Sequence, residues 1–393
     1  MYLTNKTFLT FFFTLVIFFL IRQVPFKSYS FIMNIALILF FIFNIKNILS
    51  NLKQEKDIYF IIQISFIILL IYILYALFIE NEITLIIRFL VILFLIILAY
   101  LVKPNKIYIR IFMILITIQA LFIIGFEMYL IYNFNLENYK PIRAIFLNNA
   151  WGDVYTYTGQ WWKIQLKGNA LLPFAFFLSI IYYSGFKRIV FVTIFILSIF
   201  CAGNFAFILG ILLFSGLFYL YEQRWTIQKI IIKFSTVSVL VLLVSLPAYS
   251  YLQDVVAKKA ISSNPIRVDQ SNVLVDNMSK NITTLLLGRG LGNTINIKTQ
   301  WRDYSDKIYY ELQSLYILNQ VGLLFFIWFM FINILLSKYF IKYNILLIVY
   351  GSYIFYAFFN PYFLDTNQVV VIVILLSLRK VLDEKSILNT SSI

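Results

Sequence analysis

Histidine is absent from this sequence, and cysteine occurs only once, as Cys201. Without histidine the chain lacks the commonest general base and the commonest metal ligand. A single cysteine inside an apolar run excludes a disulfide framework and a cysteine metal site. Any chemistry that the protein performs therefore depends on carboxylates, arginines and hydroxyl groups.

Charge is also scarce, because 12% of the residues are charged and 62% are hydrophobic. Soluble domains contain about a quarter charged residues, so this composition predicts a membrane protein. The 42 Phe and 28 Tyr residues suit helices that face lipid and anchor at the headgroups. The net charge of +15 would suit nucleic acid, but most of the excess falls where it sets membrane orientation.

Apolar runs of membrane-spanning length recur along the chain. A bilayer core roughly 30 Å thick needs about 20 helical residues. The runs are 7–22, 28–45, 58–79, 83–102, 107–132, 169–185, 188–202, 204–221, 231–249, 312–336, 343–359 and 366–380. They predict an all-α, polytopic membrane protein with one transmembrane domain, 1–393, of about twelve helices. If 188–202 and 204–221 form a re-entrant hairpin, two crossings are lost and the sidedness is unchanged.

Two long polar loops, 133–168 and 250–311, each follow an odd-numbered run, so both must lie on one side of the membrane. More than half of the 32 basic residues fall at helix ends and short loops of the other side. Short loops on the side of the long loops hold only Arg22 and Lys27. The positive-inside rule therefore places both long loops outside and both termini in the cytoplasm. The first run lacks a small-residue cleavage site, and we expect a retained helix.

Two ionisable residues fall inside predicted helices. Arg88 and Glu127 lie five residues from the outer ends of their runs, roughly 7–8 Å below the surface. They can form a structural ion pair between adjacent helices, or each can extend to the interface. The functional alternative is that Arg88 lies beneath a phosphate-binding site.

The first long loop contains Arg143 and the aromatic segment WGDVYTYTGQWWK, residues 151–163. Trp and Tyr are enriched at membrane interfaces, which explains the segment without a ligand. Rigid aromatic faces beside polar groups also suit sugar rings. Trp161 and Trp162 are accordingly candidate substrate-binding residues.

The second long loop opens with Arg267, at the start of a segment whose apolar spacing predicts a short amphipathic helix over 267–278. The segment TLLLGRGLGN follows, at 284–293. Its spacing is not that of a dinucleotide site. Alternating glycines can nevertheless expose backbone N–H groups and hold Arg289 outward toward a phosphate. The alternative is a plain irregular turn.

Glu311 lies near the start of the segment YYELQSLYILNQVGLL, where the chain returns to the membrane. Burial there would raise the pKa of its carboxyl enough for general-base work. The alternative is an ordinary acidic residue at a helix start. Several polar residues continue from this point and recur before the last helix, and together they predict a polar cavity open to the outside: Gln313, Asn319, Gln320, Asn360, Asp365, Asn367 and Gln368.

This layout resembles the oligosaccharide repeat-unit polymerases, the O-antigen and capsule polymerase or Wzy family, which share an architecture with the O-antigen ligases. As topology the resemblance covers nearly the whole chain. As sequence it is concentrated in Arg267, LLGRGLGN and YYELQSLYILNQVGLL, and in the hairpin FCAGNFAFILG at 200–210. Ligases typically carry a histidine in the large loop, and this chain has none. Arginine is common at the hairpin turn, where this chain has Asn204.

The resemblance implies a glycosyltransferase of the bacterial plasma (inner) membrane that builds capsule or the O-antigen of lipopolysaccharide. Its partners would be a donor glycan and an acceptor repeat unit, both linked to undecaprenyl diphosphate in the bilayer, and a chain-length regulator. Glu311 would be the base, and Arg267 and Arg289 would stabilise the departing diphosphate without metal or cofactor. Further substrate contacts would come from Arg143, Arg88, Trp161, Trp162 and Gln313. The alternatives are a polysaccharide-unit flippase and an O-antigen ligase.

Overall fold

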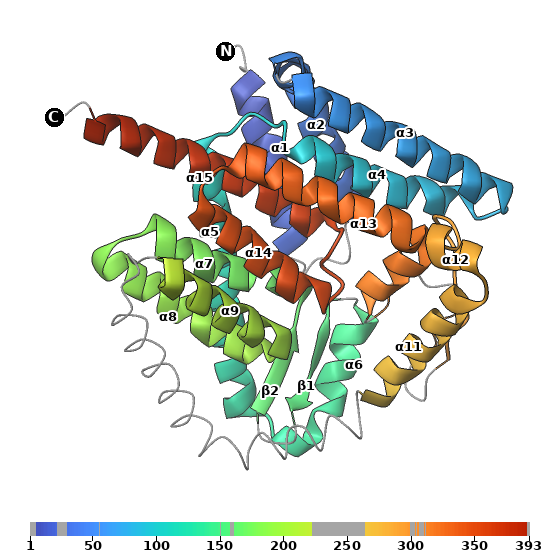
Figure 1. Cartoon of the computed structure of the whole chain (residues 1–393). Coiled ribbons are helices and arrows are strands. Elements are labelled where there is room, and N and C mark those ends of the chain that lie inside the picture. Colours follow the sequence, from blue (N-terminus) through green and yellow to red (C-terminus); the bar gives the residue numbers. More distant parts are fainter. Residues whose placement is uncertain are drawn as a thin grey trace, which may run out of the picture.

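The computed structural model describes residues 5–21, 30–54, 56–149, 151–157, 161–221, 264–298, 303, 305, 310 and 312–390. This part of the chain is mostly helical (Figure 1). Both labelled ends lie on the upper side of Figure 1, while α6, the two strands and α11 lie on the opposite side. The helices between these two sides form the hydrophobic core.

The predicted apolar runs form helices, with ends that differ by a few residues at most places. They are α1 (Asn5–Ile21), α2 (Ser30–Gln54), α3 (Lys56–Phe78), α4 (Ile83–Ala99), α5 (Lys106–Asn133), α7 (Leu172–Tyr182), α8 (Gly185–Ala202), α9 (Phe205–Tyr221), α13 (Gln313–Ile341), α14 (Asn344–Phe358) and α15 (Thr366–Thr390). Among the described helices, five are long and apolar enough to cross a membrane: α2, α3, α5, α8 and α13. The chain is therefore a mostly helical, multi-pass membrane protein. The predicted run 231–249 lies outside the described residues, and the total of about twelve stays a prediction.

The first long loop corrects the expectation of a purely helical fold. It contains η1 (Leu136–Asn138), α6 (Lys140–Asn148), an antiparallel pair of strands, β1 (Asp153–Tyr157) and β2 (Trp161–Gln165), and η2 (Lys167–Leu171). Val154 pairs with Ile164, and both side chains are fully buried. Strand β2 alternates half-buried and buried residues, as one covered face requires. The sequence analysis of this segment rested on its aromatic residues and did not include the alternation of side chains that marks a strand.

Helix α13 is interrupted at Gly322, although the sequence predicts a continuous helix over 312–336. The backbone there has φ 69° and ψ 174°, a conformation that only glycine adopts readily. A Cβ atom on Gly322 would lie 2.3 Å from the carbonyl oxygen of Leu286 and 2.4 Å from the backbone nitrogen of Gly288. The glycine segment of the second long loop therefore packs directly into the break.

Hydrogen bonds fasten this glycine segment on two sides. The Arg289 N–H donates to the carbonyl of Asn319 at 2.8 Å, and the Gly292 N–H donates to Gln320 Oε1 at 2.8 Å. From the turn between α3 and α4, the Asn81 amide donates to the carbonyls of Arg289 and Leu291, each at 3.0 Å. The segment is thus held between α13 and the α3–α4 turn.

A buried polar network joins four helix segments in the core. The Tyr100 hydroxyl donates to the Tyr350 hydroxyl at 2.9 Å, and Gln368 Nε2 donates to the same oxygen at 2.9 Å. Tyr350 in turn donates to Asn333 Oδ1 at 3.2 Å. Polar groups surrounded by lipid and protein need partners within the protein, so this network fixes how α13, α14 and α15 meet the end of α4.

We predict that Gly322→Ala destabilises the protein by at least about 2 kcal/mol, since the new methyl group would strain the backbone and overlap the carbonyl of Leu286. The measurement is denaturant unfolding of the purified protein in micelles. Gly351→Ala in α14 is the matched control, because a Cβ there meets no atom within 4 Å. Equal stability of the two variants would contradict the role given to the break.

Candidate functional site

The described parts of the two long loops gather on one side of the molecule. In Figure 1, α6, β1 and β2 lie toward the bottom, α11 (Asn264–Ser279) lies at the lower right, and α12 (Ile282–Leu287) lies above it at the right. Helix α6 packs on β1, and α11 and α12 both pack on α13. The placement of both complete loops on the outer side of a membrane stays a prediction.

Three charged side chains from separate segments interact electrostatically. Asp365 lies in the turn between α14 and α15, Arg88 lies in α4, and Lys167 begins η2. Both cations interact electrostatically with the Asp365 carboxylate, and Arg88 also interacts with Tyr316 in α13. Arg88 and Lys167 are exposed, whereas Asp365 is half-buried. This group is called the Asp365 centre below.

The carboxylate of the Asp365 centre is held by its own turn. Oδ1 accepts the Thr366 N–H and Oδ2 accepts the Asn367 amide, both at 2.6 Å. Burial raises the pKa of Asp365, while these two donors and the charges of Arg88 and Lys167 oppose the rise. A carboxylate beside two exposed cations can accept a proton while the cations bind an anion.

Neighbouring polar groups connect this turn to two further helices. Asn204, in the turn between α8 and α9, donates to Asn360 Oδ1 at 2.9 Å. Ser314, near the start of α13, donates to the carbonyl of Phe358 at 2.6 Å.

The sequence predicted a polar region at Asn360 and Asp365 but not the participation of Lys167. The only sequence signal for Lys167 was its position as a lone cation just before the apolar run 169–185.

Arg143, predicted to contact substrate, forms an ion pair within the first loop. Its Nε and Nη2 donate to the two oxygens of Asp153 at 2.8 and 2.9 Å, and its guanidinium lies 5.1 Å from the centre of the Tyr155 ring. Burial lowers the pKa of Arg143, but the Asp153 carboxylate raises it, and the net shift is upward. The pair joins α6 to β1, so the guanidinium fork is already occupied.

The two predicted sugar-binding tryptophans differ in exposure. Trp162 is 0% exposed, so neither face of its ring is open to a sugar in this structure. Trp161 is half-buried, and its ring centre lies 5.9 Å from that of Phe200. The alternation of β2 explains the difference, because successive side chains of a strand point to opposite faces.

Of the alternatives for Arg88 and Glu127, the ion pair between them does not form. Glu127 is buried against the first loop, where it accepts the backbone N–H of Trp162 and interacts with Cys201. Helix α15 packs against both α4 and α5 and separates them. Helices α4 and α5, which are consecutive in the sequence, are therefore not neighbours in space.

The three residues predicted to meet in one pocket are placed as follows. Arg289 is half-buried, and its Nε and Nη2 donate to the carbonyl of Asn277 at 3.3 and 3.1 Å, which caps the end of α11. Arg267 is exposed near the start of α11, ten residues and about 15 Å along the axis from Asn277. Glu311 lies outside the described residues. The structure thus places the two arginines at opposite ends of α11.

Helix α11 confirms the predicted helix, but its buried face differs from the one expected. Leu274 and Gln270 are fully buried, whereas Val268 is 53% exposed. The Asn319 amide of α13 donates to the carbonyl of Leu274 at 3.1 Å. Gln313, predicted to contact substrate, is buried and accepts the N–H of Tyr310 at 3.1 Å, so it fixes the start of α13.

Among the described residues, no group of three or more acidic, histidine or cysteine side chains is placed to hold a metal ion. Comparison with known protein families, with curated proteins and with solved structures finds no match to this chain. The Asp365 centre is therefore defined only by electrostatic interactions within this molecule.

We predict that Arg143→Ala and Asp153→Ala each loosen the first long loop and raise its rate of proteolytic cleavage a few-fold. The pair is partly exposed, with side-chain exposures of 40% and 26%, so its contribution is about 0.5–1 kcal/mol. Lys140→Ala, at an exposed position of the same helix, is the control. A double variant, Arg143→Ala with Asp153→Ala, should be cleaved no faster than either single variant, because each single change already breaks the pair. If the two increases in cleavage rate add up fully in the double variant, the pair does not act as one unit.

Proposed function

We propose that the protein is a glycosyltransferase that joins lipid-linked oligosaccharide repeat units on the outer face of the plasma membrane. The observation that carries the proposal is the Asp365 centre, in which exposed Arg88 and Lys167 interact electrostatically with a half-buried carboxylate. The resemblance to repeat-unit polymerases supports it through the order of the parts along the chain. Donor and acceptor are glycans on undecaprenyl diphosphate.

The reaction requires a base and a means of stabilising a diphosphate leaving group. A hydroxyl of the acceptor sugar attacks the anomeric carbon of the donor, and the bond from that carbon to the diphosphate oxygen breaks. The hydroxyl proton passes to the carboxylate of Glu311, and undecaprenyl diphosphate departs as an anion. Arginine suits the anion because it stays charged and can bind phosphate oxygens in pairs. Arg88 and Lys167 supply the cations nearest the carboxylate of the Asp365 centre.

The other proposed residues act from the second long loop. Glu311 is the proposed base and Arg267 a proposed phosphate ligand. Arg289 has a proposed second role, because its bonds to Asn277 position α11 over the start of α13. Its replacement is therefore expected to affect the loop as well as the charge.

We predict that Arg88→Ala and Lys167→Ala each reduce long-chain polysaccharide at least about tenfold, as loss of one charge-assisted phosphate contact implies. The measurement is the chain-length ladder of cells whose own copy of the gene is deleted. Lys187→Ala, an exposed lysine on the opposite side, is the control. Normal ladders with both variants would dismiss the Asp365 centre as the site.

We predict that Arg267→Ala, Arg289→Ala and Glu311→Gln abolish long chains while the proteins still insert. Loss of polymerisation leaves single repeat units on the cell surface. Loss of a flippase would leave no surface glycan, and loss of a ligase would leave long chains attached to the carrier lipid. If the deletion strain has no surface glycan, the flippase replaces the polymerase as the proposal. If it accumulates long chains on the carrier lipid, the ligase does.

A further inference from the structure

The Asp365 centre holds charges of both signs. Arg88 of α4 and Lys167 of η2 both interact with the Asp365 carboxylate, so two cations and one anion share the centre. A carboxylate beside an anion-binding site repels the anion, because like charges at close range disfavour each other. The cations that hold Asp365 ionised are thus the same ones that a bound anion would use.

The Asp365 carboxylate is fixed in place by its own turn. Oδ1 accepts the Thr366 N–H and Oδ2 accepts the Asn367 amide, both at 2.6 Å. Thr366 and Asn367 are 6% and 4% exposed, so both donors belong to a packed part of the turn. A carboxylate that is held in this way can remove its repulsion of a bound anion by taking up a proton.

Asp365 is the member of the centre whose charge can change near neutral pH. Arginine and lysine stay protonated in this range. Tyr353 of α14 is a third titratable side chain that interacts with Asp365, and its hydroxyl carries a proton, which it donates to the carbonyl of Tyr362 at 2.8 Å. Burial raises the pKa of Asp365, and the charges of Arg88 and Lys167 oppose the rise. An anion bound to these two cations cancels their opposition.

We propose that the Asp365 centre binds a doubly charged phosphate anion together with one proton, which Asp365 takes up from solvent. With Asp365 ionised, the occupied centre would carry a net negative charge, whereas with Asp365 protonated it is neutral, and a half-buried site favours the neutral state. This coupling rests on the proposed function, in which the anion is the diphosphate of the donor. The proton returns to solvent when the diphosphate leaves, so Glu311 remains the base of the transfer reaction.

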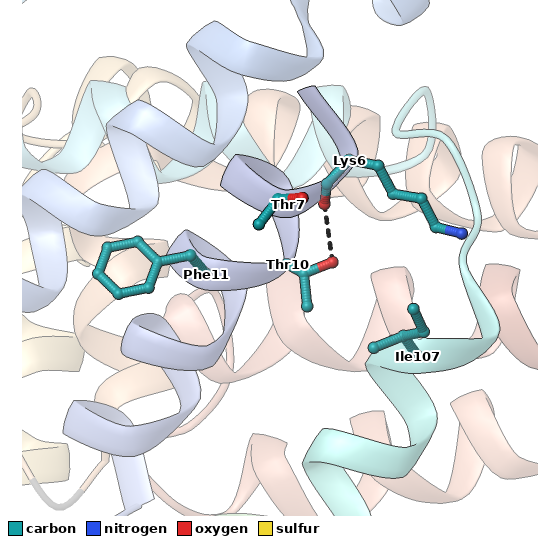
Figure 2. Close-up of a pocket in the computed structure, with 5 residues that line it drawn as sticks. All are labelled: Lys6, Thr7, Thr10, Phe11 and Ile107. Atoms are coloured by element: carbon teal, nitrogen blue, oxygen red, sulfur yellow. Dashed lines mark hydrogen bonds between the residues drawn. The ribbon is translucent and has the colours of Figure 1, made fainter. Parts of the chain in front are cut away.

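A hollow at the start of α1 offers a comparison within the same molecule. Figure 2 shows the residues that line it, which are Lys6, Thr7, Thr10, Phe11 and Ile107. Among these described lining residues, Lys6 is the one ionisable side chain, and no carboxylate accompanies it. An anion bound at Lys6 would therefore take up no proton.

The test measures sulfate binding to the full-length protein in micelles by titration calorimetry. Sulfate keeps both negative charges near neutral pH, so any proton that is taken up goes to the protein. The wild-type protein should take up close to one proton per bound sulfate, counted from the heats in two buffers of different ionisation enthalpy. Because lower pH favours protonated Asp365, sulfate should bind at least about threefold more tightly at about pH 5.5 than at about pH 7.5. Asp365→Asn should take up no proton and bind equally at both.

Two controls and two cation variants complete the experiment. Asp276→Asn, at an exposed aspartate of α11, and Lys6→Ala should both match the wild type. Arg88→Ala and Lys167→Ala should each weaken sulfate binding at least about tenfold, as loss of a charge-assisted contact implies.

The possible failures are distinguishable. If neither cation variant weakens sulfate binding, the Asp365 centre binds no anion, and the proposed function loses its site together with the proton coupling. If binding depends on both cations but is equal at the two pH values with no proton taken up, the anion site stands and the proton coupling alone is overturned. Proton uptake that persists in Asp365→Asn would likewise remove the role given to Asp365.

Discussion

The fit between the break in α13 and the glycine segment that fills it determines the arrangement of the side of the molecule that carries α11 and α12. An interrupted membrane helix exposes backbone groups that must find partners inside the protein. Here the Arg289 N–H takes the carbonyl of Asn319, and the Gln320 side chain takes the Gly292 N–H. Neither segment can carry a side chain at the contact. A Cβ atom added to Gly288 or to Gly322 would lie within 2.5 Å of the backbone nitrogen of the other glycine. The position of α11 follows, because Arg289 caps it.

The polar network around Tyr350 has the corresponding role deeper in the core. It ties Gln368 of α15 to Asn333 of α13, while α15 packs between α4 and α5. Gln368 also accepts the N–H of Leu364 at 3.1 Å, so the same side chain fixes the turn that carries Asp365. The side chain of Gln368 thus links the packing of α13, α14 and α15 to the turn that carries Asp365.

The helices were predictable because a long apolar run in a membrane has few alternatives to a helix. The failures have specific causes. Gly322 is a single glycine in an apolar run, and only its contact with Gly288, distant in sequence, makes it a break. Glu127 could not be paired from sequence, because the insertion of α15 between α4 and α5 depends on packing rather than order. Val154 and Ile164 carried a strand signal, but five-residue strands are short enough for aromatic content to obscure it.

The Asp365 centre is assembled from segments that are each fixed by interactions of their own. Asn169 donates to the carbonyl of Ile164 at 2.7 Å and Tyr356 donates to that of Ala170 at 2.8 Å, which holds η2 and Lys167 against the core. Helix α4 carries Arg88 near its start and is tied to the Tyr350 network through Tyr100 at its other end, and Asp365 is held by its own turn. Backbones fixed in this way reduce the entropy lost when two long cationic side chains close on an anion. A charged centre on rigid helix ends, with its cations exposed, is therefore better suited to binding an anionic group than to stabilising the fold.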